Sequence, residues 1–240
     1  MSRPLRALLL AAGLGTRLRP LTNHTPKCLV ELGGEPLLGH WLRKLEAAGC
    51  QEALVNTHHL SDQVTAFVQS WHSQTLRVAT VHEPRLLGTA GTLIANQAFF
   101  AGATGLLIHA DNAMADPLHD LLASHSRRPS HCLLTMLTFT TATPRSCGIV
   151  ELDLKGVVRA FHEKVVEPPG NQANAALYAF DDKFLQQLNS LGSSCSDFST
   201  EVLPALMGQI YTFHTSNNYL DIGTPEALMQ AQALWSAQPS

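Results

Sequence analysis

The sequence contains few cysteines, and none of them is spaced for a metal site or a redox pair. The five cysteines are widely scattered and odd in number (Cys28, Cys50, Cys132, Cys147 and Cys195). Without a CxxC pair, they indicate neither a zinc site nor a disulfide framework. The twelve histidines likewise form no HExxH or comparable ligand pair. We interpret the cysteines as reduced thiols in a cytoplasmic protein.

Charged residues and long apolar runs are also scarce. Only 15% of the residues are charged, the formal net charge is −3, and 45% are hydrophobic. This balance argues against non-specific binding to nucleic acid and favours the placement of individual cations for a ligand. No stretch approaches the length of a membrane span, and the opening residues lack the boundary of a signal peptide. We therefore expect a globular protein with neither a nucleic-acid nor a membrane partner.

At 240 residues the chain is long enough for one large domain with a substantial core and too short for two domains of ordinary size. Apolar periodicity predicts alternating strands and helices in the first half and mainly strands in the second. The expected strands are 7–12, 53–56, 76–82, 105–110, 132–139, 148–152, 157–163, 175–180 and 209–214; the expected helices are 37–48, 61–71, 90–100 and 225–235, with others beginning near 181 and 197. This pattern predicts an α/β, Rossmann-like fold with a mostly parallel sheet, helices on both faces and a β-rich half.

The most informative stretch is residues 8–30, LLLAAGLGTRLRPLTNHTPKCLV. A buried strand runs into a loop that contains Gly13 and Gly15, followed by Arg17 and later by Lys27. Glycines allow close backbone approach, and consecutive backbone amides form a concave anion site. The arginine and the lysine add fixed positive charge. The loop is therefore predicted to be a phosphate cradle.

Two common phosphate loops do not match this stretch. No Gly-Lys-Ser/Thr of a Walker loop follows, and Leu18 stands where a dinucleotide fingerprint needs a third glycine. The alternative is a flexible turn with solvated arginines. Pro20 and Pro26 stiffen the loop and favour the phosphate cradle.

Two aspartates follow strands at the edge where the cradle is expected. Asp111 ends the strand in IHADNAMAD, and Asp221 precedes the closing helix in YLDIGTPE. Because ligands of such sheets bind beyond the carboxyl ends of the strands, the two carboxylates suggest a Mg²⁺ site completed by phosphate oxygens and water. Taken singly, either residue could equally be a helix cap or a loop aspartate.

Two further segments carry groups suited to a ligand. Glu163, Lys164 and Asn174 flank a proline–glycine loop, where they could bind sugar hydroxyls and a phosphate or simply form a solvated hairpin. Gly88 and Thr89 in LLGTAGTL could line a slot for a ring or ribose, or serve only tight packing. The residues alone favour the solvated hairpin in the first segment and leave both alternatives open in the second.

Taken together, these motifs resemble the sugar-1-phosphate nucleotidyltransferases. The resemblance rests on GLGTRLRPLT…TPK, LGTAGT, the strand ending in Asp111, Glu163-Lys164, Asn174…Tyr178 and the DIGT motif at 221–224, and it spans about residues 6–228. It implies a GT-A-like fold and the synthesis of a nucleotide-activated sugar such as GDP-mannose, GDP-heptose, a UDP-sugar or dTDP-glucose.

The resemblance also implies roles for individual residues. The implied catalytic residues are Arg17, Lys27 and Asp111. The implied Mg²⁺ ligands are Asp111 and Asp221. The implied nucleotide-binding residues are Ala11, Ala12, Gly13, Gly15, Thr16, Arg17, Lys27, Gly88 and Thr89. The implied sugar phosphate-binding residues are Gly148, Glu163, Lys164 and Asn174.

The sequence departs from the family pattern at three positions. Ala110 and Ala176 replace glycines, and Cys28 replaces a common proline. None of these departures removes a charge, although Ala176 is expected to narrow the sugar pocket. Hexapeptide repeats of a left-handed β-helix are absent. We therefore expect residues 1–240 to form a single catalytic domain without a C-terminal β-helix.

The expected reaction is direct in-line attack by a sugar 1-phosphate on the α-phosphate of an NTP, with Mg²⁺ and release of pyrophosphate. The favoured reading is a guanylyltransferase for mannose- or heptose-1-phosphate, with GTP as nucleotide and a role in nucleotide-sugar biosynthesis for cell envelope polysaccharide. The alternatives are a uridylyl- or thymidylyltransferase using UTP or dTTP, for example one resembling N-acetylmuramate-1-phosphate uridylyltransferase, and a catalytically silent nucleotide-sugar-binding regulatory subunit. The expected assembly is a monomer or small homo-oligomer.

Two other classes are disfavoured. A glycosyltransferase of related architecture should carry a DxD pair where this chain has Asp111-Asn112-Ala113. A dehydrogenase should end its second strand on an acidic residue, whereas this one ends near Asn56.

Overall fold

The computed structural model describes residues 3–192, 194–215 and 219–236. The chain forms two compact units, each built from several stretches of sequence. The first unit takes Met1–Arg6, Leu87–Leu107 and Leu118–Ser216, and the second takes Ala7–Leu86, Ile108–Pro117 and Asn217–Ser240. The prediction of a single catalytic domain is not tested by this division and stays a prediction.

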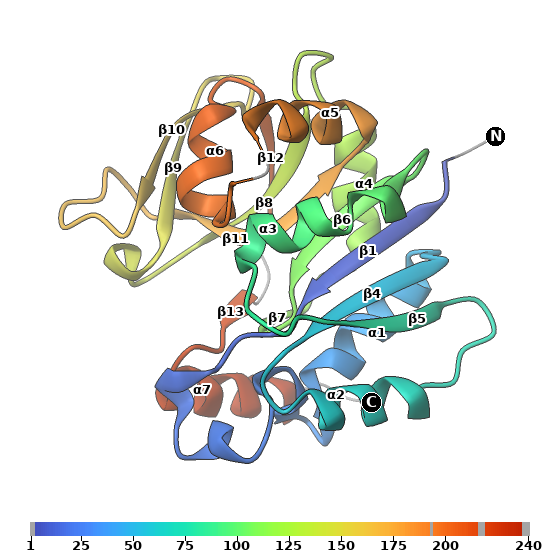
Figure 1. The fold of residues 1–240 in the computed structure, drawn as a ribbon. Coiled ribbons are helices and arrows are strands. Elements are labelled where there is room, and N and C mark those ends of the chain that lie inside the picture. Colours follow the sequence, from blue (N-terminus) through green and yellow to red (C-terminus); the bar gives the residue numbers. More distant parts are fainter. Residues whose placement is uncertain (1–2, 193, 216–218, 237–240) are drawn as a thin grey trace. The chain divides into compact units, whose positions relative to one another are not determined.

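The second unit is an α/β layer in which parallel strands alternate with helices (Figure 1). Its main elements are β1 (Leu5–Leu10), α1 (Leu37–Ala47), β4 (Glu52–Thr57), α2 (Ser61–Ser70), β5 (Arg77–His82) and the end of β6 (Thr104–His109). The strand order is β6-β1-β4-β5, and β4 pairs with β5 in parallel from Glu52↔Arg77 to Thr57↔His82. β1 is almost entirely buried, whereas the edge strand β5 alternates between exposed and half-buried residues. The continuous apolar run of β1 and the mixed pattern of β5 follow from these positions.

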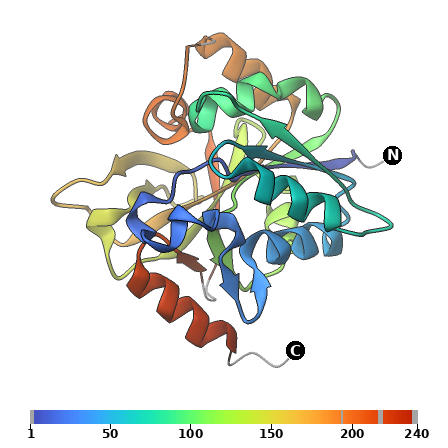
Figure 2. The same ribbon diagram turned by 60° about the horizontal axis from the view of Figure 1, so that its bottom comes forward.

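A smaller group of elements packs against the residues that follow β1. It contains β2 (Glu31–Leu32), β3 (Glu35–Pro36), β7 (Asn112–Met114), β13 (Tyr219–Asp221) and α7 (Pro225–Ser236). β7 and β13 pair in antiparallel fashion, and α7 lies beside the segments that follow β1 (Figure 2). The Thr224 hydroxyl accepts a hydrogen bond from the amide of Ala227 at 3.2 Å and thereby caps the closing helix. A buried apolar cluster fixes this group: Leu18, Val30, Leu32, Leu37, Ala113, Ile222, Leu228 and Ala231.

The first unit is richer in β-structure and mostly antiparallel. Its elements are α3 (Gly88–Ala95), α4 (Leu118–Ser126), β8 (Leu134–Thr140), β9 (Gly148–Leu152), β10 (Val158–Glu163), β11 (Gln172–Phe180), α5 (Asp182–Leu191), α6 (Leu203–Ala205) and β12 (Ile210–His214). β11 pairs with β8 and β9, and β9 with β10, all antiparallel; β12 pairs with β8 in parallel. The predicted α/β fold with a mostly parallel sheet is confirmed, and the sheet also contains the antiparallel strands of this unit.

Aromatic rings form the core of the first unit. Phe180 contacts Phe100 and Phe184 at ring distances of 5.0 and 5.2 Å, and Phe198 lies 4.6 Å from Tyr178. All five rings are at most 1% exposed. Edge-to-face and tilted contacts of this kind add to the burial of large apolar surfaces. This core holds β11 against the residues that follow α5.

The structure adds elements that the sequence pattern did not predict. The expected helix at 90–100 ends at Ala95 and continues as a 3-10 turn over Gln97–Phe100. α4, β7 and β13 were not predicted at all, and the last two are only three residues long. Within the described residues, the helices are too short or too polar for any of them to cross a bilayer.

A buried histidine makes the first unit sensitive to acid. His125 is 5% exposed, and its Nδ1 lies 2.9 Å from the hydroxyl of Thr135. Burial, reinforced by the charge of Arg128, lowers the pKa of His125 to about 4. The unfolded chain takes up this proton near pH 6.5. The unfolded state therefore binds more protons between pH 6.5 and 4, and stability falls as the pH drops through that window.

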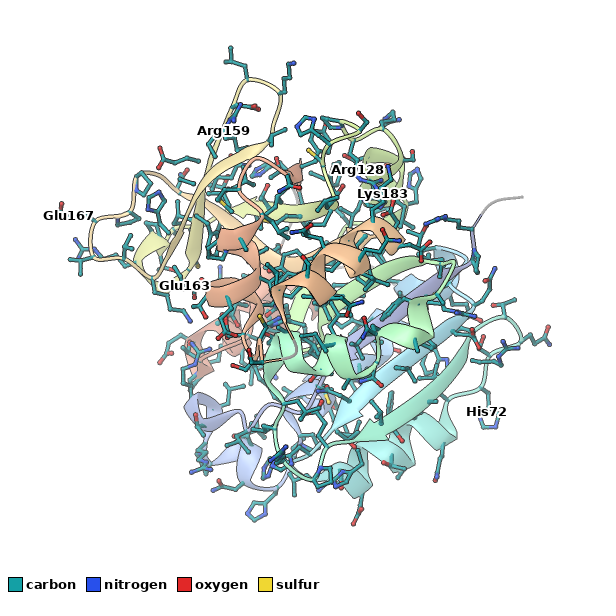
Figure 3. All side chains as sticks on the ribbon, turned by 45° about the horizontal axis from the view of Figure 1, so that its top comes forward. His72, Arg128, Arg159, Glu163, Glu167 and Lys183 are labelled. Carbon is teal, nitrogen blue, oxygen red and sulfur yellow. The ribbon has the colours of Figure 1, made fainter. Side chains whose placement is uncertain are left out.

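We expect this histidine to cost about 2 kcal/mol of unfolding free energy between pH 7.5 and 5. His125→Gln should remove that part of the pH dependence, measured by urea unfolding at both pH values. His72→Gln is the matched control, because His72 is exposed on the loop between α2 and β5 (Figure 3). Equal pH dependence in wild type and His125→Gln would contradict the assignment.

Candidate functional site

The loop after β1 presents a run of unpaired backbone donors. In the described part of the chain, no acceptor pairs with the backbone N–H groups of residues 13 to 17. The amides of Ala11 and Ala12 are occupied, because both donate to Oδ1 of Asn56 at 2.6 and 3.2 Å. The free donors thus begin at Gly13. Consecutive free N–H groups can bind an anion, so the predicted phosphate cradle fits this loop and stays a prediction.

The shape of this loop explains its two glycines differently. Gly15 has φ +59°, and a Cβ there would lie 2.8 Å from Cγ2 of the buried Thr22. The Thr22 hydroxyl also donates to the Gly15 carbonyl at 2.7 Å. Gly15 is therefore required by the turn itself. A Cβ at Gly13 would meet no described atom within 4 Å, so this position is open for the approach of a ligand.

Arg17 is an exposed cation without a hydrogen bond or ion pair among the described residues. Its guanidinium lies against the backbone of Gly223, which is buried. A Cβ at Gly223 would come within 2.8 to 2.9 Å of the guanidinium atoms. Glycine at this position therefore allows the guanidinium to rest where it does.

Lys27 joins the loop to both candidate metal ligands. Its Nζ lies 2.6 Å from Oδ2 of Asp111 and 3.7 Å from Oδ1 of Asp221. The lysine side chain is 8% exposed, whereas the two carboxylates are 34% and 48% exposed. One ammonium group therefore reaches two carboxylates at the edge of a partly open site. The sequence predicted this meeting of the two aspartates but not their ion pairs with Lys27.

The pairing of β7 with β13 brings the two aspartates together. Asp221 is paired with Asn112 in this register, and Asp111 is the residue directly before Asn112. The pairing therefore places Asp111 and Asp221 close together. Asn112 donates to the hydroxyl of Tyr219 at 2.6 Å, and its carbonyl accepts from Nε1 of Trp41 at 2.8 Å. Buried hydrogen bonds therefore fix both short strands.

Electrostatics keeps the carboxylate of Asp111 charged. Burial raises the pKa of Asp111, but the Lys27 ammonium, followed by His109, outweighs it, so the pKa lies below the ordinary value. By contrast, burial raises the pKa of the neighbouring Cys28 thiol to about 12, which makes Cys28 an unreactive core residue.

The carboxylate pair suits a hard cation. Among the described residues there is no cluster of three or more His, Cys, Asp or Glu able to hold a metal. Two carboxylates that already share one ammonium nevertheless supply anionic oxygens to a single point. Mg²⁺ is commonly bound by one or two carboxylates, with substrate phosphates and water as the other ligands. The residues present therefore fit this metal.

Gly88 and Thr89 lie in the first unit, where they contact the segment before the buried Phe198. Gly88 has φ +79°, and a Cβ there would lie 2.2 Å from the carbonyl oxygen of Ser196. That carbonyl accepts from the amide of Ala90 at 3.0 Å, and the Thr89 hydroxyl accepts from the amide of Phe198 at 2.7 Å. The packing alternative that the sequence left open accounts for the glycine. Nucleotide contact by these residues stays a prediction.

Gly148 and Glu163 are direct partners across β9 and β10, also in the first unit. A Cβ at Gly148 would lie 2.4 Å from Cζ of Phe161 and 2.7 Å from Oε2 of Glu163, so glycine leaves room for both side chains. Glu163 pairs with the exposed Lys164 at 3.2 Å. These three residues therefore lie in one group, and their predicted binding of a sugar phosphate stays a prediction.

Asn174 shapes a bulge in β11. Its Oδ1 accepts from the amide of Ala176 at 2.9 Å, and its Nδ2 donates to the hydroxyl of Tyr178 at 2.7 Å. The register with β8 shifts between Asn174 and Tyr178. Ala176 has φ +50° and Lys164 has φ +51°, a left-handed conformation that favours glycine. Strained backbone of this kind is concentrated at functional sites.

The sequence missed three residues that support the site. Asn56 holds the start of the loop, Gly223 accommodates the Arg17 guanidinium, and Asn112 links β7 to β13. The signal for Asn56 was its place at the end of the second strand, and the signal for Gly223 was its place in DIGT. No sequence signal identified Asn112.

The chain resembles known proteins in sequence and in fold. A family model described as Nucleotidyl transferase matches residues 6–238. The mannose-1-phosphate guanylyltransferase catalytic subunit beta of Drosophila pseudoobscura pseudoobscura is 30% identical over 236 residues, which are 96% of this chain and 62% of the relative. The mannose-1-phosphate guanylyltransferase of Mycobacterium tuberculosis is 30% identical over 231 residues, which are 95% of this chain and 63% of the relative. The chain thus spans 62% and 63% of the lengths of these relatives.

A solved structure from Bacillus anthracis shares the fold. It is described as a glucose-1-phosphate thymidylyltransferase in complex with a sucrose, and it superposes with a TM-score of 0.87 at 20% sequence identity. The match covers 98% of this chain and 97% of that chain.

Proposed function

Because the chain belongs to the nucleotidyl transferase family, we propose that it transfers a nucleotidyl group from an NTP to a sugar 1-phosphate and releases pyrophosphate. The observation that carries this proposal is the loop after β1. Its free N–H groups at residues 13 to 17 lie in the same unit as Arg17, Lys27 and the two aspartates. Free amides and cations suit the phosphates of an NTP, and carboxylates suit the cation that accompanies them.

The reaction needs positioning and charge stabilisation more than it needs a base. An oxygen of the sugar 1-phosphate attacks the α-phosphorus, a new P–O bond forms, and the bond to the bridging oxygen breaks in line as pyrophosphate leaves. A phosphate monoester is already anionic near neutral pH. The loop amides and Arg17 would hold the departing phosphates, and Lys27 would stabilise charge at the reacting centre.

Asp111 and Asp221 would hold Mg²⁺. When bound, this cation neutralises phosphate charge and polarises the phosphoryl oxygens. The protein contributes two oxygen ligands from short strands fixed by Asn112, and it keeps the Asp111 carboxylate ionised. The proposal thus includes a divalent metal as the cofactor.

For the substrates, we propose GTP and mannose 1-phosphate or a heptose 1-phosphate. The support is that two relatives at 30% identity are mannose-1-phosphate guanylyltransferases. UTP or dTTP with another sugar 1-phosphate is the second candidate. The presence of Arg17, Lys27, Asp111 and Asp221 disfavours a silent regulatory subunit. We further propose that residues 1–240 act as one catalytic domain in the cytoplasm, as a monomer or small homo-oligomer, in nucleotide-sugar biosynthesis.

A pyrophosphate-release screen tests the proposed function. The purified protein is incubated with Mg²⁺, each of GTP, UTP, dTTP, ATP and CTP, and a panel of sugar 1-phosphates. Release is expected to be fastest with GTP and mannose or heptose 1-phosphate, and mass spectrometry should detect the matching NDP-sugar. A preference for UTP or dTTP would select the second candidate, and no product with any pair would reject the proposal.

The sugar would be held in the first unit by Gly148, Glu163, Lys164 and Asn174. Lys164→Ala is expected to raise the KM for the sugar 1-phosphate about tenfold through the lost charge. The Lys164 side chain is 64% exposed, and its ammonium pairs with Glu163. Asn174→Ala should instead change the choice of sugar, because it removes the hydrogen bonds that Asn174 makes with the Ala176 amide and the Tyr178 hydroxyl.

Kinetics with varied sugar 1-phosphate and calorimetry with NTP alone separate the two substrates. Lys183→Ala, on the exposed side of α5, is the control for loss of a cation (Figure 3). If Lys164→Ala abolished NTP affinity and left the sugar KM unchanged, the assignment of these residues to the sugar would be wrong.

A further inference from the structure

The side chain of Asn56 connects the ends of three strands in the second unit. Asn56 lies near the end of β4 and is 3% exposed. Its Oδ1 accepts from the amides of Ala11 and Ala12 just after β1. Its Nδ2 donates to Oε1 of Glu83 at 2.9 Å, just after β5. These contacts form a clamp, consisting of Asn56, Glu83 and the two alanine amides, at the carboxyl ends of the strands.

Only one orientation of the Asn56 amide satisfies this clamp. Its oxygen must face the two N–H donors, and its NH₂ group must face the carboxylate. In the reverse orientation, the NH₂ group of Asn56 would face the two alanine N–H donors, and its oxygen would face the Glu83 carboxylate, so neither contact could be a hydrogen bond. Glu83 is itself fixed: it is 3% exposed, its amide donates to the Thr57 carbonyl at 2.9 Å, and its carbonyl lies 2.7 Å from Nδ1 of His58.

The clamp determines where the free donors of the loop begin. Ala11 and Ala12 cannot offer their N–H groups to a ligand, because Asn56 accepts both. The N–H groups of residues 13 to 17, which have no acceptor in the described part of the chain, follow directly. The Thr22 hydroxyl holds the same loop at the Gly15 carbonyl. The loop is thus held by hydrogen bonds at Ala11 and Ala12, just before the free donors, and at Gly15, among them, before any ligand binds.

We propose that Asn56 is a positioning residue for the phosphates of the nucleotide. It does not touch them, but it fixes the backbone from which the free N–H groups extend. Donors that are ordered in advance bind an anion without the cost of ordering the loop. The proposal rests on the proposed function, because it assigns the anion to the phosphates of an NTP.

Removal of the clamp should weaken phosphate binding specifically. Asn56→Ala is expected to raise the dissociation constant of inorganic pyrophosphate about tenfold, measured by calorimetry, and to raise the KM for NTP similarly. The KM for the sugar 1-phosphate should stay within about twofold, because its proposed residues lie in the other unit. Gln51→Ala, exposed just before β4, is the control. Unchanged pyrophosphate affinity in a folded Asn56→Ala protein would overturn the proposal.

A reversal of hydrogen-bond polarity separates positioning from general stability. Asn56→Asp keeps an acceptor for both alanine amides but places a second carboxylate next to that of Glu83. The repulsion between the two carboxylates should disturb the clamp and lower the affinity for pyrophosphate. Adding Glu83→Gln restores a donor toward position 56 and should recover most of the lost affinity. Glu83 has further contacts, so Glu83→Gln alone is measured as the reference for the double variant. Recovery of the melting temperature without recovery of pyrophosphate affinity would overturn the proposal.

The results distinguish this proposal from the proposed function. If wild type binds pyrophosphate and the polarity series behaves as expected, but no NTP and sugar 1-phosphate react, the proposed function fails and the role of Asn56 in anion binding stands. If wild type is active and Asn56→Ala has the same KM for NTP, only the proposal for Asn56 fails.

Discussion

Replacement of Lys27 by alanine is expected to lower kcat/KM for pyrophosphate release about a hundredfold while the protein remains folded. The largely buried ammonium lies 2.6 Å from Asp111 and 3.7 Å from Asp221, at the end of the loop that carries the free amides. A hundredfold loss corresponds to about 2.7 kcal/mol of transition-state stabilisation, within reach of one charged contact in a shielded site.

Two further variants control for the volume of the Lys27 side chain and for the loss of a cation elsewhere. Lys27→Met keeps the length of the side chain and removes only the charge, so it should lose as much activity as Lys27→Ala. Lys155→Ala, on an exposed turn, should lose none. Circular dichroism and thermal unfolding establish that each variant is folded. Near-normal turnover by a folded Lys27→Met protein would show that the ammonium is not at the reacting centre.

Arg17 offers an independent test of the same loop. Arg17→Ala should also lose about a hundredfold, and because Arg17 is exposed its removal should not affect stability. Gly223→Ala should reproduce part of this loss, since its methyl group would lie within 2.9 Å of the guanidinium. Gly170→Ala is the matched control, because a Cβ at Gly170 meets no described atom within 4 Å. Full activity of both Arg17→Ala and Gly223→Ala would remove Arg17 from the site.

The parts of the site that are local in sequence could be predicted from it. The buried strand, the two glycines and the cations follow one another within residues 8–30. The structure forms β1 from the strand and places the glycines, Arg17 and Lys27 in the turns that follow it. The helix at 37–47 was also predictable, because its apolar residues recur with helical spacing and are buried: Leu37, Leu38, Trp41, Leu42 and Leu45. Local patterns of this kind report which face of an element is buried.

The contacts that complete the site depend on elements too short for such patterns. β7 and β13 are three residues each, and the hydrogen bond between Asn112 and Tyr219 spans 107 positions of sequence. Three residues are too few to show the alternation of apolar and polar side chains by which a strand is recognised in a sequence. The meeting of the two aspartates was therefore predicted from the general rule for strand ends, whereas their actual cause is this antiparallel pair.

Side-chain pairings were the least predictable feature. The sequence assigned Lys27 to phosphates and the aspartates to a metal, and it gave no sign that the two groups would contact each other. Asn56 was noticed only because an acidic residue was missing there, and its bond to Glu83 depends on the register of β4 and β5. Charge and residue type identify candidate groups, but the register decides which of them meet.

Replacement of either candidate metal ligand should produce the second large effect. Asp221→Asn removes one anionic oxygen from the pair and should raise the Mg²⁺ concentration needed for half-maximal activity at least about tenfold. Asp111→Asn should be more severe, because it also removes the 2.6 Å partner of the largely buried Lys27. Asp62→Asn, on the exposed first turn of α2, is the control.

Asp221 is the sharper test of the two, because its side chain is 48% exposed and its replacement leaves the close ion pair of Lys27 with Asp111 intact. A loss of activity in Asp221→Asn that excess Mg²⁺ restores identifies a ligand, whereas a loss that Mg²⁺ does not restore identifies a structural role. Wild-type turnover should stop in a chelator and resume when Mg²⁺ is added. Turnover that persists in excess chelator, or an unchanged Mg²⁺ requirement in a folded Asp221→Asn protein, would show that these carboxylates do not hold the metal.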